Sequence, residues 1–302
     1  MRPMSAETPV IEIDHLVRRF GRADAVDGLS LRVAHGRCYG FFGRNGAGKT
    51  TTIKCLLNLL HPTSGQVRLF GQDPARHEVA VKARLAYVPD AVAFYPWMTV
   101  RDTIEYFASF RERWNRDLER LLLVQFRLDP GQKTSHLSKG QRTQLALLTA
   151  ICAEPELLIL DEPTSGLDPI VRREFIQTVI GSYQEQGPRT VFVSTHLISE
   201  FEGLIDEFTI IERGRAVLTL DADTARERYQ KVFARFASAP TPAALSGVRV
   251  LRQRGREVEV VVNGNVSSVV ERLRASAVET LTTEALTLEE IFVTAVQPAG
   301  AA

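Results

Sequence analysis

A glycine-rich stretch at residues 43–51 constrains the fold of this chain more than any other part of its sequence. The stretch reads GRNGAGKTT, a full match to the phosphate-binding pattern G-x-x-x-x-G-K-[ST]. The apolar run 38–42 before it predicts a buried strand, and residues 51–60 after it predict a helix with few charges. A strand, a tight glycine turn and a helix in this order predict an α/β domain that binds a nucleotide.

The residue types in this loop suit phosphate chemistry. Glycines let the backbone turn tightly and bring bare N–H groups to a phosphate, and the following helix directs its positive end at the same anion. We expect Lys49 to reach the β and γ phosphates and the Thr50 hydroxyl to complete the shell of a Mg²⁺ ion. The predicted nucleotide-binding residues of the loop are Gly43, Arg44, Asn45, Gly46, Ala47, Gly48, Lys49, Thr50 and Thr51.

A pair of carboxylates follows a second apolar strand. The apolar residues 157–160 predict a central strand that ends in Asp161 and Glu162. Asp161 suits the Mg²⁺ shell, and Glu162 stands where a base for the attacking water is needed. An acidic pair is also a common start of a loop. The pair indicates a nucleotide site only because the glycine loop is present in the same chain. His196 follows a further apolar strand, 190–194, where a lone histidine is usually structural.

The bulk composition narrows the class of protein. The chain has 302 residues and a formal net charge of +1, so it lacks the basic footprint of a nucleic-acid binder, and we expect no nucleic-acid partner. Its 3 cysteines have neither metal-ligand nor paired spacing and read as small buried hydrophobes. No apolar run approaches the ~18 residues of a membrane span, and the first ten residues lack the core of a secretory signal. These observations predict a cytosolic polypeptide.

The remaining patterns predict two domains. Alternation at 10–14 and 29–33 predicts half-exposed strands, Thr99 and Asp102 fit a capping box that opens a helical stretch to about Phe126, and residues 207–220 predict a closing hairpin. After residue 221 we expect a charged helix at 221–230, strands at 248–251, 257–262 and near 280, and helices at 266–277 and 287–296. The predicted domains are 1–220, with a helical insert at about 91–156, and a small α/β accessory domain, 221–302.

Between the two nucleotide motifs lies the sequence Leu137-Ser138-Lys139-Gly140-Gln141, and here the chain resembles the ATP-binding cassette (ABC) ATPases, whose signature is L-S-G-G-Q. The resemblance covers about residues 10–220. It implies an α/β P-loop NTPase core of the RecA-like type with an antiparallel β subdomain and a helical insert. It also implies that ATP is bound with Mg²⁺ and is hydrolysed between two subunits.

The resemblance assigns roles to individual residues. It makes Phe20 the aromatic that stacks on adenine, Glu162 the general base and His196 the switch that contacts the γ-phosphate. Ser138, Gly140 and Gln141 would contact nucleotide held by the partner subunit. The loop at the dimer interface would consist of Ser165, Gly166, Leu167 and Asp168.

Three positions depart from the family pattern. Asp90 stands where the family often has Gln, and acidic residues there are typical of the antibiotic and drug exporters, which this chain resembles most. Asp90 is expected to approach Mg²⁺ through water. Lys139 replaces the first glycine of the signature and adds a cation near the incoming phosphate. Phe20 replaces the more usual Tyr, which leaves the preference for ATP over GTP open.

Residues 91–98 are unusually aromatic for a connecting stretch. One interpretation is packing of the helical insert onto the main sheet. The other, implied by the resemblance, is a groove that takes a short cytoplasmic helix of a membrane subunit.

The leading hypothesis is therefore the ATPase subunit of an ABC exporter, acting with a separate transmembrane permease at the inner face of the cell membrane. The alternative is a soluble ABC ATPase that acts on a ribosome or nucleic acid. A degenerate regulatory cassette is disfavoured by the presence of Lys49, Asp161, Glu162 and His196. The sequence leaves open the transported substrate and the choice between a homodimer and a heterodimer with a second ABC ATPase.

Overall fold

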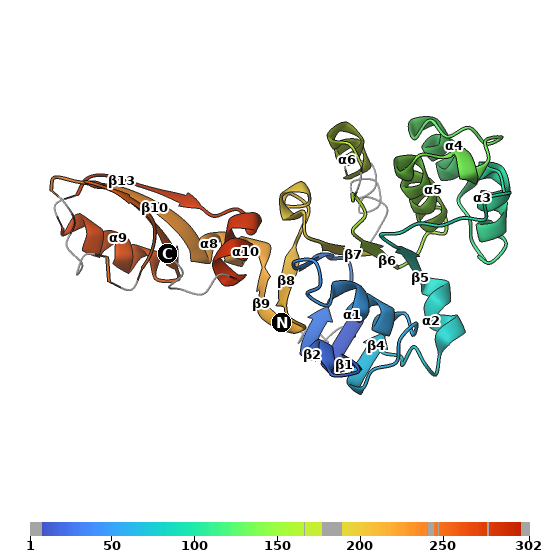
Figure 1. Cartoon of the computed structure of the whole chain (residues 1–302), viewed down its shortest axis with the longest axis horizontal. Coiled ribbons are helices and arrows are strands. Elements are labelled where there is room, and N and C mark those ends of the chain that lie inside the picture. Colours follow the sequence, from blue (N-terminus) through green and yellow to red (C-terminus); the bar gives the residue numbers. More distant parts are fainter. Residues whose placement is uncertain are drawn as a thin grey trace, which may run out of the picture. The chain divides into compact units, whose positions relative to one another are not determined.

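The chain divides into two compact units. The computed structural model describes residues 8–165, 167–176, 189–238, 240, 245–246, 248–276 and 278–296. The units are residues 1–217 and 218–302, and the division falls inside strand β9 (Arg215–Asp221) (Figure 1).

The first unit contains two sheets and a group of helices. Besides β9, its strands are β1 (Ile11–Phe20), β2 (Ala23–Val33), β3 (Cys38–Phe42), β4 (Ser64–Leu69), β5 (Leu85–Val88), β6 (Leu157–Asp161), β7 (Thr190–Thr195) and β8 (Glu207–Glu212). Its helices are α1 (Lys49–Leu56), α2 (Glu78–Arg84), α3 (Val100–Ala108), α4 (Arg116–Gln125), α5 (Lys139–Ile151) and α6 (Pro169–Ile176), with 3₁₀ turns η1 (Thr134–His136) and η3 (Ile198–Glu200).

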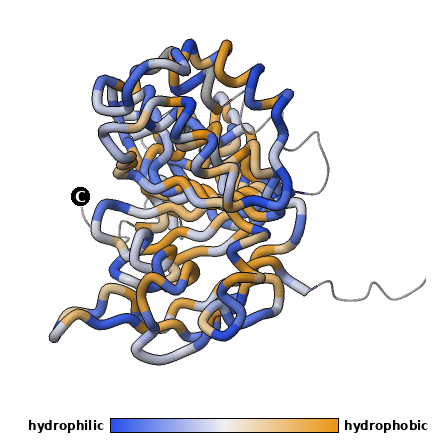
Figure 2. Tube along the Cα trace, turned by 90° about the vertical axis from the view of Figure 1, so that its right-hand side faces the viewer, coloured by the Kyte–Doolittle hydropathy of each residue, from blue (hydrophilic) through white to orange (hydrophobic). Residues whose placement is uncertain are grey.

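A six-stranded sheet forms the centre of this unit, in the order β5-β6-β7-β3-β8-β9. Strands β5, β6, β7, β3 and β8 pair in parallel. Every residue of β3, β6 and β7 is buried, as expected for parallel strands that are covered on both faces. In Figure 2 several hydrophobic stretches run through the middle of the trace.

A second, antiparallel sheet has the order β2-β1-β4. Strands β1 and β2 are longer than the sequence pattern predicts, because only 10–14 and 29–33 alternate regularly. The register of β1 shifts between Ile13 and Leu16, where His15 adopts a left-handed φ of 46°. A bulge of this kind interrupts the alternation without ending the strand.

The helical insert lies between β5 and β6 and consists of α3, α4, η1 and α5 (Figure 1). The predicted capping box at its start is confirmed: the Thr99 hydroxyl accepts from the Asp102 N–H, and the Asp102 carboxylate accepts from the Thr99 N–H. Helix α2 was not predicted. Helix α1 ends at Leu56, earlier than predicted, because Asn58 takes a left-handed φ of 56°.

In the residues that the structure describes, the second unit consists of a four-stranded antiparallel sheet and three helices. The sheet order is β11-β12-β10-β13, formed by β10 (Tyr229–Phe236), β11 (Arg249–Arg254), β12 (Glu257–Asn263) and β13 (Val278–Ala285). The helices are α8 (Ala222–Arg228), α9 (Val266–Arg274) and α10 (Leu288–Val296). Strand β10 was missed, because the charged helix predicted for 221–230 extends into it. Its signal is the alternation of buried Val232, Ala234 and Phe236 with more exposed residues.

Candidate functional site

Three neighbouring strands bring the predicted motifs to one edge of the six-stranded sheet. Strands β6, β7 and β3 are adjacent and parallel, so their carboxyl ends lie at the same edge. The glycine loop follows β3, the carboxylate pair ends β6, and His196 follows β7. Parallel α/β sheets bind ligands at this edge as a rule.

The glycine loop is packed closely against β2, β8 and the turn that follows β8. A Cβ at Gly43 would lie 2.6 Å from the Ile211 carbonyl oxygen. Gly48 has a φ of 109°, and a Cβ there would lie 2.4 Å from the Ala25 carbonyl oxygen. The Gly214 N–H donates to the Ala47 carbonyl at 2.9 Å. Lack of space therefore requires a glycine at 43, and both backbone conformation and lack of space require one at 48.

Lys49, the first residue of α1, is buried in this loop. Its Nζ donates to the Gly43 carbonyl at 2.7 Å and lies 3.0 Å from Glu162 Oε1. The ammonium group is thus held between the loop backbone and a carboxylate, within the loop whose backbone is suited to phosphate.

Asp161 is fully buried at the end of β6. The Thr50 hydroxyl donates to its Oδ2 at 2.8 Å, and the Ser194 hydroxyl donates to its Oδ1 at 2.9 Å. Burial raises the pKa of Asp161, the two hydroxyl hydrogen bonds oppose this, and the charge of Glu162 adds to the rise. A carboxylate and a hydroxyl in contact form an oxygen donor pair of the kind that Mg²⁺ prefers.

Glu162 lies between Lys49 and His196. Its Oε2 accepts from the Thr195 hydroxyl at 3.1 Å and from the His196 N–H at 3.3 Å, and lies 2.8 Å from His196 Nδ1. Its Oε1 is buried and contacts Lys49 Nζ without hydrogen-bond geometry. One carboxylate oxygen is therefore anchored, and the other faces the lysine.

The two hydroxyls at the end of β7 were missed at the level of the sequence. Ser194 holds Asp161, and Thr195 holds Glu162, because Asp161 and Ser194 are direct partners in the β6–β7 pairing. The available signal was a pair of polar residues at the end of an otherwise apolar strand.

Two predicted residues lie outside this cluster of charges. Phe20 ends β1 with 48% of its surface exposed, and the Arg18 guanidinium lies 4.7 Å from the centre of its ring. Asp90 is exposed just after β5. Burial, together with the charges of Asp161 and Asp90, raises the pKa of Tyr87, which places Asp90 in the electrostatic neighbourhood of the site.

The signature residues lie at the start of α5. Ser138 and Gln141 form a reciprocal capping box, in which each side chain bonds the backbone N–H of the other. A Cβ at Gly140 would lie 3.2 Å from Leu167 Cδ2, so the start of α5 is close to the predicted interface loop. In that loop Ser165 is half-buried, and the Asp168 carboxylate accepts from the Val171 N–H at 3.1 Å. Gly166 lies outside the described residues.

The fold and the site together define a P-loop nucleotide hydrolase. Comparison with protein families matches residues 26–165 to the ABC transporter family. The bacitracin transport ATP-binding protein BcrA of Bacillus licheniformis is 35% identical over 224 residues, which cover 74% of this chain and 73% of that protein. The chain belongs to the ATP-binding subunits of ABC transporters, a family of ATPases that bind and hydrolyse ATP, and the predicted fold class is confirmed.

Other relatives extend the likeness. The daunorubicin resistance ATP-binding protein DrrA3 of Streptomyces coeruleorubidus is 33% identical and covers 93% of this chain and 94% of its own length. A solved ATP-binding subunit of an ABC transporter has a TM-score of 0.66 at 27% identity, over 72% of this chain and 92% of that chain. A dimeric ATP-binding cassette bound to ADP and phosphate shares the fold, with a TM-score of 0.62 at 19% identity over 70% of this chain and 98% of that chain.

Among the residues that the structure describes, no helix is both long and apolar enough to cross a membrane.

Proposed function

We propose that this chain is the ATP-hydrolysing subunit of an exporter whose membrane-spanning part is a separate permease chain. The single observation that carries the proposal is the placement of Glu162 between Lys49 and His196 at the edge where the glycine loop begins. Relatives named for bacitracin transport, daunorubicin resistance and Nod factor export support export over action on a ribosome or nucleic acid.

The geometry suggests how the chain would use ATP. The loop backbone and Lys49 bind the phosphates, and Lys49 exchanges its contact with Glu162 for the more highly charged phosphate. Glu162 Oε1 then becomes free to take a proton from the attacking water, since Oε2 stays held by Thr195 and His196. His196, exposed on the outer side of Glu162, is placed to contact the γ-phosphate.

The residues at this edge also fit a Mg²⁺ ion. Thr50 and Asp161 would hold it, and Asp90 would reach it through water. When bound, Mg²⁺ neutralises phosphate charge that develops during phosphoryl transfer.

Two cassettes would complete each site. The start of α5 and Leu167 lie together on one chain, and Ser138 with the N–H groups around it would bind the γ-phosphate of nucleotide on the partner. The partner is a second copy or a related ATPase, as the dimeric relative suggests. The cassette would be residues 1–220, residues 221–302 would form an accessory domain, and the permease would hold the assembly at the inner face of the membrane.

An exposed group of rings would form the docking surface for the permease. Tyr95 and Trp97 stack with ring centres 4.9 Å apart, and Tyr95 contacts Tyr106 of α3 edge to face. Tyr95 is 47% exposed and Trp97 66% exposed, so these rings pack on each other and on α3 without being buried. We call Tyr95, Trp97, Tyr106 and Phe110 the aromatic patch. Exposed apolar anchors of this kind suit a short helix of a membrane subunit.

Replacement of Glu162 by Gln tests the role of the base. We expect the variant to bind ATP, to lose at least about 100-fold in turnover, and to accumulate as an ATP-bound dimer on size-exclusion chromatography. Glu112→Gln, an exposed position in the same unit, is the matched control and should turn over normally. Normal turnover of Glu162→Gln would refute the assignment.

Purification of the tagged chain from membranes in mild detergent tests the partner. A strongly hydrophobic subunit in stoichiometric amount supports the exporter, and recovery of ribosomes or soluble partners alone refutes it.

A further inference from the structure

The ring that is predicted to stack on adenine lies at the tip of a hairpin beside the phosphate-binding loop. Phe20 is the last residue of β1 and pairs with Ala23 of β2 across the turn at 21–22. Further along β2, the Ala25 carbonyl approaches Gly48 so closely that a Cβ at Gly48 would lie 2.4 Å from it. The exposed ring therefore lies a short way along the same strand from the loop that would hold the phosphates.

An arginine covers one face of this ring. The Arg18 guanidinium carbon lies over the Phe20 ring, 4.7 Å from its centre. Arg18 Nε is shielded from solvent and has no hydrogen-bond partner in the described part of the chain. A desolvated N–H without an acceptor costs free energy, and the negative face of an aromatic ring can compensate for part of this cost. The two side chains therefore stabilise each other's position.

The segment that follows α1 holds Arg18 in place. Arg18 Nη1 donates to the His61 carbonyl at 2.7 Å. The Thr63 N–H donates to the Val17 carbonyl at 2.7 Å, and the Thr63 hydroxyl accepts from the Arg19 N–H at 3.0 Å. The guanidinium thus links the ring to the segment that leaves the helix of the phosphate-binding loop.

We propose that Arg18 is a positioning residue for the adenine base. It fixes the Phe20 ring with one face covered and leaves the other face to stack on the base. The inference rests on the proposed function, because it assumes that ATP binds at this edge of the sheet, and it adds a residue to that site. A phenylalanine has no hydroxyl group through which it could be anchored, so the cation takes the place of a hydrogen bond in fixing this ring.

The proposed role predicts which kinetic constants depend on Arg18. A ring that is fixed before the nucleotide arrives loses less conformational entropy on binding. Arg18 would act through Phe20 on the base and not on the phosphates. Its loss should therefore raise the Kd for nucleotide and the KM for ATP and leave kcat unchanged.

Isothermal titration calorimetry of the full chain with Mg²⁺ and ADP tests the proposal, because ADP carries the base and is not hydrolysed. We expect Arg18→Met to raise the Kd for ADP by about three- to fivefold, and Phe20→Leu to raise it at least as much. Arg18→Gln keeps a donor for the His61 carbonyl but has no charge, and it should lose as much affinity as Arg18→Met. Added to Phe20→Leu, Arg18→Met should have no further effect, because the ring through which it acts is absent.

Steady-state ATPase assays separate this role from a general structural one. The KM for ATP should rise by the same factor as the Kd for ADP in both Arg18 variants, with kcat within about twofold of the parent value. Damage to the fold would lower kcat instead, and circular dichroism establishes that each variant is folded.

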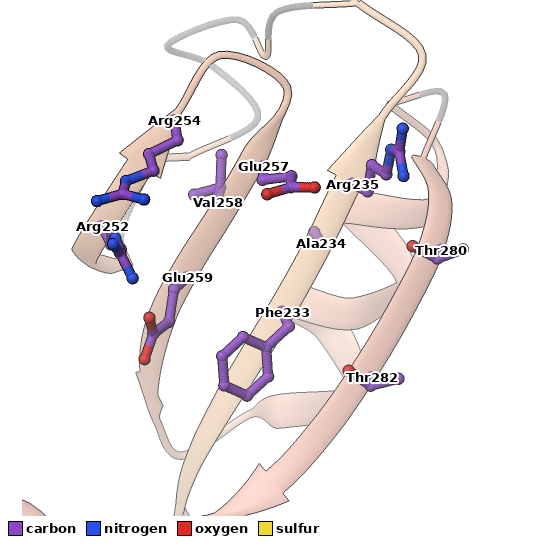
Figure 3. Close-up of a pocket in the computed structure, with 10 residues that line it drawn as sticks. All are labelled: Phe233, Ala234, Arg235, Arg252, Arg254, Glu257, Val258, Glu259, Thr280 and Thr282. Carbon is purple, nitrogen blue, oxygen red and sulfur yellow. The ribbon is translucent and has the colours of Figure 1, made fainter.

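Two exposed positions provide matched controls, one for the cation and one for the ring. Arg32→Met removes an arginine of β2 whose Nη2 lies 2.9 Å from Glu12 Oε1. Phe233→Leu removes a ring of β10 that is 38% exposed and lines a pocket of about 400 Å³ in the second unit, together with Arg252 and Arg254 (Figure 3). Both controls should leave the Kd for ADP unchanged.

The outcomes distinguish this inference from the proposed function. A parent chain that neither binds nor hydrolyses ATP would refute the proposed function and this inference with it. If the parent does both, the inference alone is overturned when Arg18→Met binds ADP like the parent or when Arg18→Gln keeps full affinity. A further loss on adding Arg18→Met to Phe20→Leu, or a fall in kcat without a rise in KM, would also overturn it.

Discussion

At the scale of single residues, Thr195 is a positioning residue for the carboxylate that would act as the base. Its hydroxyl donates to Glu162 Oε2 at 3.1 Å and accepts from the Leu197 N–H at 3.0 Å. Without this donor, the Glu162 carboxylate keeps its contacts with His196 but loses its side-chain hydrogen bond from β7.

We therefore expect Thr195→Val to lower kcat by about 10-fold with little change in KM for ATP, in the range of losses seen when a supporting hydrogen bond is removed. Thr195→Ser retains the hydroxyl and should keep most of the activity. Steady-state ATPase assays of both variants measure this effect. Equal losses in the two would show that the methyl group, and not the hydroxyl, matters.

The glycines of the phosphate-binding loop differ in how much they tolerate a side chain. Gly46 and Gly48 both have positive φ, which costs a non-glycine residue about 1 kcal/mol. A Cβ at Gly46 meets open space, whereas one at Gly48 meets the Ala25 carbonyl. Gly48→Ala should therefore lower the free energy of unfolding by clearly more than Gly46→Ala does, as urea unfolding of the two variants would measure. Equal losses would indicate that the loop shifts to accept the clash.

The sequence alone predicted much of the charged cluster that the structure brings together at this edge of the sheet. A motif with fixed spacing predicts the roles of Lys49 and Thr50. A strand that ends in two carboxylates predicts those of Asp161 and Glu162. The contacts of Ser194 and Thr195 are different, because they depend on which strand lies beside β6 and in which register. Pairing between strands distant in the sequence carries no local signal.

At the scale of elements, an ion pair joins the starts of two neighbouring strands of the main sheet. Arg84 precedes β5, and Glu156 precedes β6. The Arg84 guanidinium donates to both carboxylate oxygens of Glu156, from Nε at 2.7 Å and from Nη2 at 2.6 Å. The hydrogen bonds from Arg84 lower the pKa of Glu156 below its ordinary 4.5, and the charge of His35 lowers it further. Burial of Glu156 opposes this shift.

Because the folded-state pKa is lowered, the pair stabilises the fold above the ordinary pKa, and this contribution is lost as pH falls through the lowered value. Glu156→Gln should cost about 0.5 kcal/mol at pH 7, since both side chains are more than a third exposed. The cost should vanish in acid. Urea unfolding at pH 7 and at acidic pH measures it, with Glu112→Gln as the control. A cost that is independent of pH would contradict the ionic account.

Elements were predictable where one pattern ran through the whole segment. Four elements fall within two residues of their predicted bounds: β3, β6, β8 and α10. The strands have continuous apolar runs, and the helix begins at a capping box. In the first strand the bulge at His15 hid the length of β1. At Tyr229 a charged helix passes directly into β10, with no glycine or proline between them to mark the change.

At the scale of the whole molecule, the chain would hydrolyse ATP to drive transport by a membrane partner. ATP hydrolysis by the chain and transport by the complex can therefore be measured separately. The aromatic patch lies on the helical insert, which follows Asp90 in the chain and leads to the signature at α5. A partner helix docked there would sense movement of the insert when two cassettes close on ATP.

We predict that Tyr95→Ser combined with Trp97→Ser leaves ATP hydrolysis by the isolated chain within about twofold, because exposed rings contribute little to folding, as surface substitutions in general do. Transport should fall at least about tenfold, because rings at the centre of an interface carry most of its binding energy. Transport assays in cells that also contain the permease measure the second effect, and thermal unfolding verifies the fold. Val124→Ser on α4, another exposed apolar position of the insert, is the control and should change neither quantity. Loss of folding in the double variant would instead show that the aromatic patch is structural, and unchanged transport would place the docking surface elsewhere.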